Sequence, residues 1–320
     1  MIAHGSTEVE VEGRRIVLKN LDKPFYPEAG FTKGDVIDYY ARIAPAVLPH
    51  LRDRPLTLKR YPDGVQGPYF YEKRCPRHRP GWVRTAAIQH SDGEVIDYCV
   101  VDGLATLVWL ASIADLELHT PLALAGSIDR PTTLAFDLDP GPPADVVTCC
   151  EVALLLRRLM DGLGLASFPK TSGSKGLQIY VPLDGAATYD ATKAFAHAVA
   201  RALERAFPAL VVERMQKSLR PGKVLVDWSQ NDRNKTTVCA YSLRARSRPT
   251  VSTPVRWEEL ERAARTGRAD ALTFEAADVL ARVARDGDLF APVLSLAQRL
   301  PDVAALANES PSPAAPREGR

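Results

Sequence analysis

The chain has 320 residues, of which 46% are hydrophobic and 25% are charged, and its formal net charge is +2. These values are ordinary for a folded globular protein and argue against a disordered or fibrous chain. No apolar run approaches the ~20 residues of a transmembrane helix, and Met1–Gly5 lacks the apolar core of a signal peptide. We therefore expect a cytoplasmic protein that does not bind membranes.

The first 130 residues alternate strand patterns with two helix patterns. Glu8–Lys19 predicts a hairpin, and Thr32–Asp35 resembles a capping box that opens a helix over residues 36–51, kinked or split at Pro45. An apolar run predicts a second helix over residues 103–116. Further strands are predicted over residues 56–61, 69–71, 82–88 and 95–101.

The second half of the chain continues the alternation. Helices are predicted over residues 144–163, 191–207, 257–266 and 276–285, and strands over residues 134–139, 167–170, 177–181, 224–228 and 236–241. The class is therefore α+β (mixed α/β). We expect one domain over residues 1–300, with an N-terminal module to about residue 130 and a second module over 131–300. Residues 301–320 are rich in Pro, Ser and Ala and predict a disordered tail.

The cysteines give no clear disulfide or metal signature. Their odd number and the lack of a CxxC pattern argue against a disulfide framework and fit a reducing compartment. Cys75 and His78 could form half of a zinc site, completed by His90 and Cys99, but the spacing is not that of a known zinc finger. We expect no zinc.

Asp137 and Asp139 end an apolar strand and are followed at once by Pro140. Residues two apart on a strand point to the same face, so the two carboxylates leave the sheet side by side. A divalent cation would relieve their repulsion, although solvated turn carboxylates are the simpler interpretation. A second apolar strand ends in Asp227 and could bring a third carboxylate to the same edge, which favours a two-metal site.

Cationic segments accompany these carboxylates. Between residues 214 and 248, nine Lys and Arg residues are opposed only by Asp227 and Asp232, which indicates a polyanionic substrate or, alternatively, a solvated basic face. The loop over residues 170–176, Lys-Thr-Ser-Gly-Ser-Lys-Gly, could bind an anion through its amides, or be a flexible turn. Candidate phosphate ligands are Ser172, Lys175, Lys217, Arg220, Arg244 and His119.

Aromatic residues stand near cations in the first module. Tyr69, Phe70 and Tyr71 have the composition of a base-stacking platform, and Lys59 and Arg60 precede them. The alternative is an ordinary strand with aromatic residues in the core.

The motifs together resemble a known family. The segments Phe136–Pro140, 170–176, Lys217–Arg220, Val226–Asn231 and Tyr241–Arg244 are similar to the archaeo-eukaryotic primase superfamily, and within it to the polymerase domain of bacterial ligase D and its stand-alone relatives. The resemblance implies an RRM-like sheet joined to an N-terminal α/β module. It also implies templated nucleotide addition to a primer, with two Mn²⁺ or Mg²⁺ ions and a preference for ribonucleotides.

The resemblance also assigns roles to residues. It implies that Asp137, Asp139 and Asp227 bind the metals, that the triphosphate is held by Ser172, Lys175 and Arg244 with His119 nearby, and that Lys217 and Arg220 lie on a mobile loop. Phe70 and Tyr71 would stack on bases, and Lys59 would contact nucleotide or template. Lys23 and Lys33, with Asn20, would grip the 5′-phosphate of a gap. Gln178 stands where many relatives have histidine, and it can donate to a phosphate but cannot carry charge.

The function implied is that of a DNA-directed nucleotidyltransferase that fills short gaps during non-homologous end joining or excision repair. Its partners would be gapped or broken DNA that is preferentially 5′-phosphorylated, NTPs or dNTPs, and possible associates such as a DNA ligase and Ku on the nucleoid. Two alternatives remain: a non-catalytic module that bridges DNA ends, and a metal-dependent phosphoesterase.

Overall fold

The structure is a computed structural model that describes residues 6–90 and 92–303. Predictions made for Met1–Gly5 and for residues 304–320 lie outside the described residues. The α-helices are α1 Lys33–Leu51, α2 Leu104–Ser112, α3 Val146–Gly162, α4 Tyr189–Ala206, α5 Trp257–Thr266, α6 Ala276–Asp286 and α7 Pro292–Ser295. Short 3₁₀ helices are η1 Pro27–Ala29, η2 Ala125–Ser127, η3 Lys217–Leu219, η4 Trp228–Gln230 and η5 Ala269–Leu272. The predicted α+β class is confirmed.

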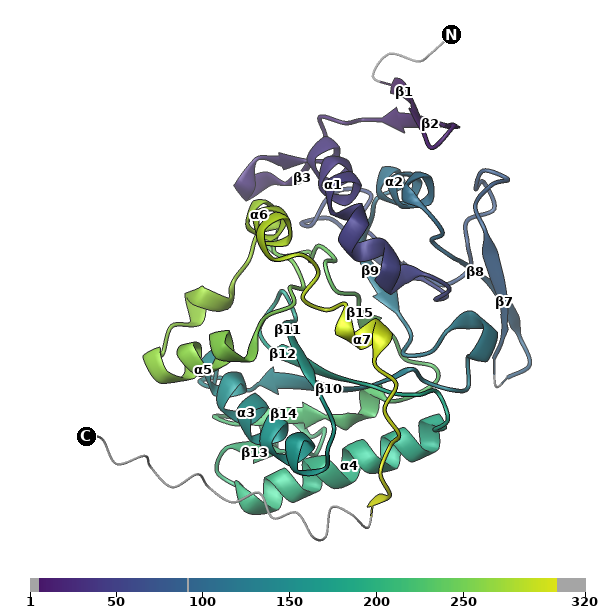
Figure 1. Cartoon of the computed structure of the whole chain (residues 1–320). Helices are drawn as coiled ribbons and strands as arrows, with labels where there is room; N and C mark the ends of the chain where they lie inside the picture. The colour runs from purple at the N-terminus through teal and green to yellow at the C-terminus, as the bar shows by residue number, and fades with distance from the viewer. Residues whose placement is uncertain (1–5, 91, 304–320) are drawn as a thin grey trace.

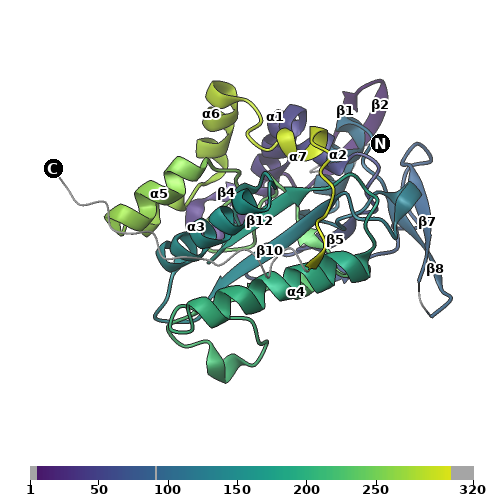
Figure 2. The same cartoon turned by 60° about the horizontal axis from the view of Figure 1, so that its bottom comes forward.

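A five-stranded sheet forms the lower half of the molecule in Figure 1, with the order β11-β12-β10-β14-β13. Its strands are β10 Thr133–Pro140, β11 Phe168–Thr171, β12 Leu177–Pro182, β13 Val211–Val212 and β14 Val224–Asp227. Helices α3 and α4 cover one face, as Figure 2 shows, and pack on Leu134, Phe136 and Leu138. Ala135 belongs to the other hydrophobic core. Asp137 therefore faces away from these helices, because alternate residues of a strand share a face.

A four-stranded sheet with the order β15-β9-β5-β6 lies beside the first. Its strands are β5 Thr57–Arg60, β6 Phe70–Glu72, β9 Asp115–Thr120 and β15 Thr237–Val238. The prediction of helix to residue 116 was wrong here, because α2 ends at Ser112 and the chain reverses through Ala114, whose φ is +68°. The residues that follow form β9, which lies between β5 and β15.

Three two-stranded hairpins complete the N-terminal region and are visible along the upper and right edges of Figure 1. They are β1 Ser6–Val11 with β2 Arg14–Lys19, β3 Pro24–Tyr26 with β4 Phe31–Thr32, and β7 Thr85–Gln89 with β8 Val95–Cys99. The capping box at α1 is confirmed, since Thr32 and Asp35 bond each other's backbone amides. Pro45 and Pro49 both lie inside α1, which is not split.

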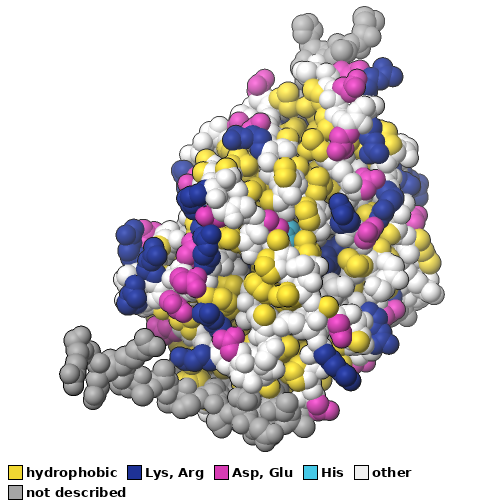
Figure 3. Space-filling model, in the orientation of Figure 1, with side chains coloured by type: hydrophobic (Ala, Val, Ile, Leu, Met, Phe, Trp, Pro, Cys, Tyr) yellow, Lys and Arg dark blue, Asp and Glu magenta, His cyan; other side chains and the backbone are white. Residues whose placement is uncertain are grey.

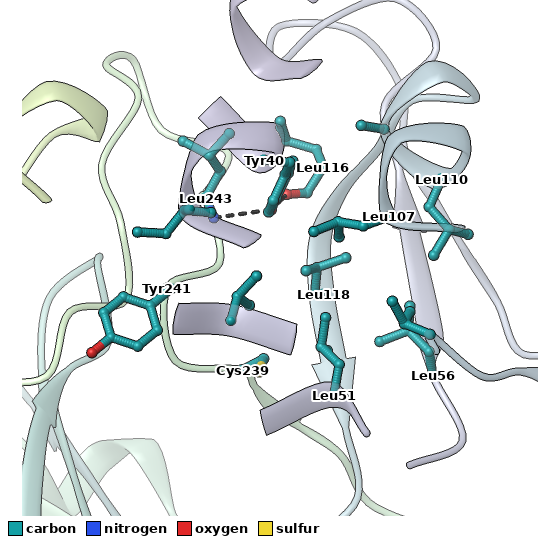
Figure 4. Packing of buried hydrophobic residues seen from close by; sticks show 14 of the residues in the cluster. Tyr40, Leu51, Leu56, Leu107, Leu110, Leu116, Leu118, Cys239, Tyr241 and Leu243 are labelled. Carbon is teal, nitrogen blue, oxygen red and sulfur yellow. Dashed lines mark hydrogen bonds between the residues drawn. The ribbon is translucent and has the colours of Figure 1, made fainter. Parts of the chain in front are cut away.

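Two hydrophobic cores hold the sheets together. One lies beneath α3 and α4, and the other joins α1, α2 and the four-stranded sheet to residues far along the chain. Figure 4 shows the second core, in which the hydroxyl of Tyr40 accepts a hydrogen bond of 3.1 Å from the amide of Leu243 and donates one of 2.6 Å to the carbonyl of Leu116. These contacts fix the segment after β15 against α1 and β9, so the two sheets have a defined relative position.

The cysteine prediction requires correction. Cys75 and Cys99 form a disulfide, whereas Cys149, Cys150 and Cys239 are free and buried. The odd number of cysteines argued against a framework of several bridges but could not exclude a single one. Both thiols that the sequence suggested for zinc are therefore bonded to each other.

The described part of the chain contains no helix long and apolar enough to cross a membrane. On the face shown in Figure 3, Lys and Arg side chains are interspersed with Asp and Glu, with apolar atoms between them.

Candidate active site

A row of polar side chains crosses the five-stranded sheet. Asp137 on β10 is the direct antiparallel partner of Asp227 on β14 and of Gln178 on β12. Gln178 in turn pairs with Lys170 on β11. Directly opposed residues have Cβ atoms about 4.5–5.5 Å apart, so the register alone brings two carboxylates together. Asp139, two residues along β10, points to the same face, and three carboxylates converge at this edge.

Burial and the repulsion between neighbouring carboxylates raise the pKa values of Asp137 and Asp139. Burial, followed by the charges of Asp139 and Asp227, raises the pKa of Asp137 to about 7. Burial and the charge of Asp227 also raise the pKa of Asp139, although its side chain is exposed at the mouth of the pocket. Asp227 accepts hydrogen bonds from the amide and hydroxyl of Ser229 and from the Gln230 side chain.

These residues fit the divalent ions that the family resemblance implies. Their donors are carboxylate oxygens, the ligands that Mg²⁺ and Mn²⁺ prefer, and a cation would relieve the repulsion that raises the pKa of Asp137. Within residues 6–90 and 92–303, no three His, Cys, Asp or Glu side chains are already arranged around one metal position. The Ser229 and Gln230 bonds that hold Asp227 would therefore rearrange when an ion binds.

An open pocket of about 240 Å³ lies between the two sheets. Both Asp137 and Asp139 line it from the five-stranded sheet, and His119, Thr237 and Val238 line it from the four-stranded sheet. The other lining residues are Ser172, Ser174, Lys175, Gln178, Gln230, Thr236 and Arg244. Two of the three carboxylates and most of the predicted triphosphate ligands therefore share one cavity, and Asp227 lies next to Asp137 on β14.

The loop that enters the pocket depends on two glycines. A Cβ at Gly176 would lie 2.0 Å from the carbonyl oxygen of Leu138, and one at Gly173 would lie 2.7 Å from the Cγ of Arg244. The Ser172 hydroxyl accepts hydrogen bonds from the amides of Ser174 and Gly176, at 3.2 and 3.1 Å. The loop is therefore held in shape by hydrogen bonds between the Ser172 hydroxyl and its own amides, and the exposed Lys175 lines the pocket.

Gln178 contacts Asp137, one of the carboxylates predicted to bind metal. The ammonium of the fully buried Lys170 donates hydrogen bonds of 2.6 Å to Gln178 Oε1 and to Ser252 Oγ. Because Oε1 is engaged, the amide NH₂ of Gln178 is the group that faces Asp137, and its hydrogen bond lowers the Asp137 pKa. Sequence reasoning did not single out Lys170, since one lysine at the end of a strand carries no local signal.

On the four-stranded sheet, across from the carboxylates, Glu117 of β9 is another residue that was not predicted from the sequence. Lys59 is its direct partner on β5, and Tyr71 on β6 is opposite Lys59. The Lys59 ammonium lies 4.7 Å from the ring centre of Tyr69 and 5.5 Å from that of Tyr71. Tyr69, Phe70 and Tyr71 are all exposed, with 44–55% of their surface accessible, so they are not core residues.

The residues predicted to grip a 5′-phosphate lie together beside the β3–β4 hairpin. The Lys33 amide donates to the Lys23 carbonyl, and the Lys23 amide donates to the Asn20 carbonyl. Burial, then the nearby charges of Lys23, Arg60 and Lys19, lowers the pKa of Lys33. The Lys23 ammonium is paired with Asp63 at 2.6 Å.

The loop after β13 carries Lys217 and Arg220. The Lys217 side chain is exposed, and the Arg220 guanidinium donates to the carbonyl of Met215 at 2.7 Å. The charge of Arg220 acts on Asp139 and lowers its pKa, against the larger effect of burial. Arg220 therefore lies near Asp139, although it is not one of the residues that line the pocket.

Comparisons with known proteins identify the family. The profile described as "LigD, primase-polymerase domain" matches residues 32–290. The multifunctional non-homologous end joining DNA repair protein LigD of Mycobacterium tuberculosis is 44% identical over 284 residues, which are 86% of this chain and 36% of that protein. The bifunctional LigD of Bacillus subtilis is 34% identical over 249 residues, 77% of this chain and 40% of that protein. This chain thus spans well under half the length of these relatives.

A solved structure agrees with the sequence comparisons. The polymerase domain from Mycobacterium tuberculosis Ligase D in complex with DNA superposes with a TM-score of 0.81 at 42% identity, covering 89% of this chain and 99% of that one. The chain belongs to the LigD primase-polymerase domain family, whose members are nucleotidyltransferases.

Proposed function

We propose that the chain is a DNA-directed polymerase that adds NTPs or dNTPs to a primer in short gaps during DNA repair, by non-homologous end joining or excision repair. The observation that carries the proposal is the cross-strand pairing of Asp137 with Asp227. Asp137 and Asp139 line a pocket whose other lining includes His119 and Arg244, and Asp227 lies beside Asp137 on the neighbouring strand. Such carboxylates can hold the metal ions that activate a primer 3′-hydroxyl, and the basic side chains can compensate the negative charge of a nucleoside triphosphate.

Within this proposal each side of the pocket has a task. Ser172, Lys175 and Arg244 hold the triphosphate, with His119 beside them. Two Mn²⁺ or Mg²⁺ ions bound by the aspartates would activate the primer 3′-hydroxyl and neutralise the pyrophosphate. The chain's own contribution is to align the α-phosphate with the primer terminus and to compensate the triphosphate charge.

The DNA partner is proposed from the structural relative, which was solved in complex with DNA. On this chain, Phe70 and Tyr71 are exposed and free to stack on bases, and Lys59 lies beside them. Asn20, Lys23 and Lys33 would bind the 5′-phosphate on the far side of a gap. The relatives are named as non-homologous end joining proteins, and the proposal therefore includes Ku and a DNA ligase as associates on nucleoid DNA in the cytoplasm.

Primer extension on a gapped duplex, with manganese and ATP, tests the proposal. The unmodified chain should extend the primer, and Asp137→Ala, Asp139→Ala and Asp227→Ala should each abolish extension while leaving DNA binding largely intact. Near-normal extension by Asp137→Ala would refute the assignment. Nucleotide release from DNA without any triphosphate would instead indicate a phosphoesterase, and DNA binding without either reaction would indicate an end-bridging module.

A further inference from the structure

Glu117 is a buried carboxylate that three cationic side chains surround. It is 2% exposed and lies on β9, between β5 and β15. Its Oε2 is 3.0 Å from Nε2 of His119 and 3.2 Å from the ammonium of Lys59. The same oxygen is 3.3 Å from Nε of Arg244, which reaches it from the segment after β15.

The charge of Glu117 is maintained by its neighbours. Burial alone would raise the pKa of Glu117, but the hydrogen bond from His119 and the charges of Arg244, His119 and Lys59 together lower it well below its usual range. The carboxylate therefore stays ionised at any working pH. A buried carboxylate needs such partners because an unpaired charge in the interior is costly.

The Glu117 contact also decides what His119 can offer to a ligand. A carboxylate only accepts hydrogen bonds, so Nε2 of His119 must carry a proton. Only Nδ1 then remains, and it can donate to an anion solely when the ring is protonated. His119 lines the pocket, so its protonation state acts on any triphosphate bound there.

The surroundings of His119 act on its protonation in opposite directions. Burial is the largest influence and, with the charges of Arg244 and Lys59, lowers the pKa of His119 below its usual value, although Glu117 acts to raise it. The remaining neighbours are the edge of the Tyr71 ring, at 5.8 Å, and the charged lining of the pocket, Asp137, Asp139 and Lys175. Glu117 is the neighbour that hydrogen-bonds the imidazole and stabilises its charged form.

We propose that Glu117 is a positioning residue of the nucleotide site, which aligns Lys59, His119 and Arg244 around a triphosphate and keeps a proton of His119 on Nε2, so that Nδ1 faces the pocket. The inference rests on the proposed function, because it assigns the pocket to a nucleotide. Glu117 does not touch the nucleotide itself. It acts through three side chains from separate segments of the chain, at the junction of the two sheets.

A purely structural role has to be separated from positioning. Glu117 Oε1 also accepts a hydrogen bond of 2.9 Å from the amide of Ala245, which fixes the segment after β15. Glu117→Gln keeps the side-chain shape and an acceptor for this amide but removes the charge. Asp115→Asn is the matched control: Asp115 is fully buried on the same strand and face, its pKa is raised well above the usual range by burial, and none of the three cationic side chains contacts its carboxyl group.

The first measurement is a histidine-ring NMR titration of the intact chain, with His119→Ala used to assign the resonance. We expect the pKa of His119 to fall by at least about 1 unit in Glu117→Gln, since an opposite charge within hydrogen-bond distance shifts a pKa by about that much. Asp115→Asn should leave the titration unchanged. A merely structural contribution of Glu117 would not move this titration.

The second measurement is ATP binding by calorimetry, with primer extension alongside. Glu117→Gln should weaken ATP binding at least about tenfold and raise KM more than it lowers kcat, with the largest loss at acid pH, where Glu117 favours the protonated His119 ring. Glu117→Asp keeps the charge, but its shorter side chain places the carboxylate farther from its partners. It should weaken ATP binding several-fold. If Glu117→Gln does not fold, the ATP affinity of Glu117→Asp tests the positioning role instead.

The outcomes are distinguishable from those of the proposed function. A folded Glu117→Gln whose His119 titration and ATP affinity match the unmodified chain would overturn the positioning role, even if primers are extended. Wild-type affinity in Glu117→Asp would do the same. Failure of the unmodified chain to extend any primer, while it binds ATP in a Glu117-dependent way, would overturn the polymerase proposal alone.

Discussion

Lys170 and Gln178 are cross-strand neighbours, and the Lys170 ammonium donates a hydrogen bond of 2.6 Å to the side-chain oxygen of Gln178. The lysine has no exposed surface, and burial lowers its pKa to about 7. This contact orients the Gln178 amide toward Asp137, so a buried lysine acts, through Gln178, on one of the carboxylates proposed to bind metal.

Replacing Lys170 by methionine should change how stability depends on pH. In the unfolded chain the lysine stays protonated up to its ordinary pKa of 10.5, whereas in the folded protein it loses its proton near 7. Between these values the unfolded state binds more protons, so the contribution of Lys170 to the free energy of unfolding rises with pH. Relative to Lys170→Met, the unmodified chain should gain about 1–2 kcal/mol between about pH 7.5 and 9 in urea unfolding.

Lys193→Met is the control, because Lys193 is a partly exposed lysine bonded to Asp232. It should leave the pH slope unchanged. Lys170→Met should also lower primer extension about tenfold or more, since Gln178 loses its orientation. Equal pH slopes for the unmodified chain and Lys170→Met would contradict the assigned pKa.

Replacing Asp137 by asparagine should separate stability from activity. The change removes one of three crowded carboxylates, so in metal-free buffer the free energy of unfolding should rise by about 1–3 kcal/mol. Extension should fall at least about a hundredfold. Manganese should raise the melting temperature of the unmodified chain and have little effect on Asp137→Asn. A variant less stable than the unmodified chain would show that the carboxylates do not repel each other appreciably.

Gly173→Ala should damage the phosphate loop through close contacts. The new Cβ would lie 2.6 Å from the Val251 carbonyl carbon and 2.7 Å from the Ser252 amide nitrogen, at a φ of +65°. Gly267→Ala is the matched control, with a φ of +68° and no atom within 4 Å. Both variants incur about 1–2 kcal/mol for the left-handed backbone. Gly173→Ala should cost a further ~1–3 kcal/mol and raise KM for ATP. Equal losses of stability in the two variants would rule out the clash.

Lys23→Ala and Lys33→Met should each remove the preference for 5′-phosphorylated over 5′-hydroxyl gaps. The two lysines lie on one cationic cluster, and a phosphate would replace the Asp63 carboxylate as the partner of Lys23. The measurement is the ratio of extension rates on the two gapped substrates. Arg42→Ala, which removes an exposed cation of α1, should keep the ratio. An unchanged ratio in both lysine variants would refute the 5′-phosphate site.

Part of this site could be predicted from local sequence. The apolar alternation that ends in Asp137 and Asp139, and the apolar strand that ends in Asp227, predicted three carboxylates at one edge, and the register places them there. Alternation is a short-range property, so it can be read without knowing the strand partners.

The residues that were missed depend on long-range pairing. Glu117 and Lys170 are single charged residues on strands, and their roles follow only from partners such as Lys59 and Gln178 on neighbouring strands. The strand β9 was itself missed, because an apolar run continues past the end of α2 and the left-handed Ala114 that separates them is not glycine. The Cys75–Cys99 pair is likewise a contact between distant segments.

The two-residue strand β15 has a consequence for dissecting the chain. It comes from the C-terminal half, yet among the described residues Thr237 and Val238 pair only with β9, through Thr120 and His119. A fragment beginning near residue 131 would therefore leave this strand without its neighbour and uncover Ala135 and the aromatic ring of Tyr180. Isolating the carboxylate-bearing half would yield an aggregation-prone polypeptide, and catalytic studies require both halves on one polypeptide or added back together.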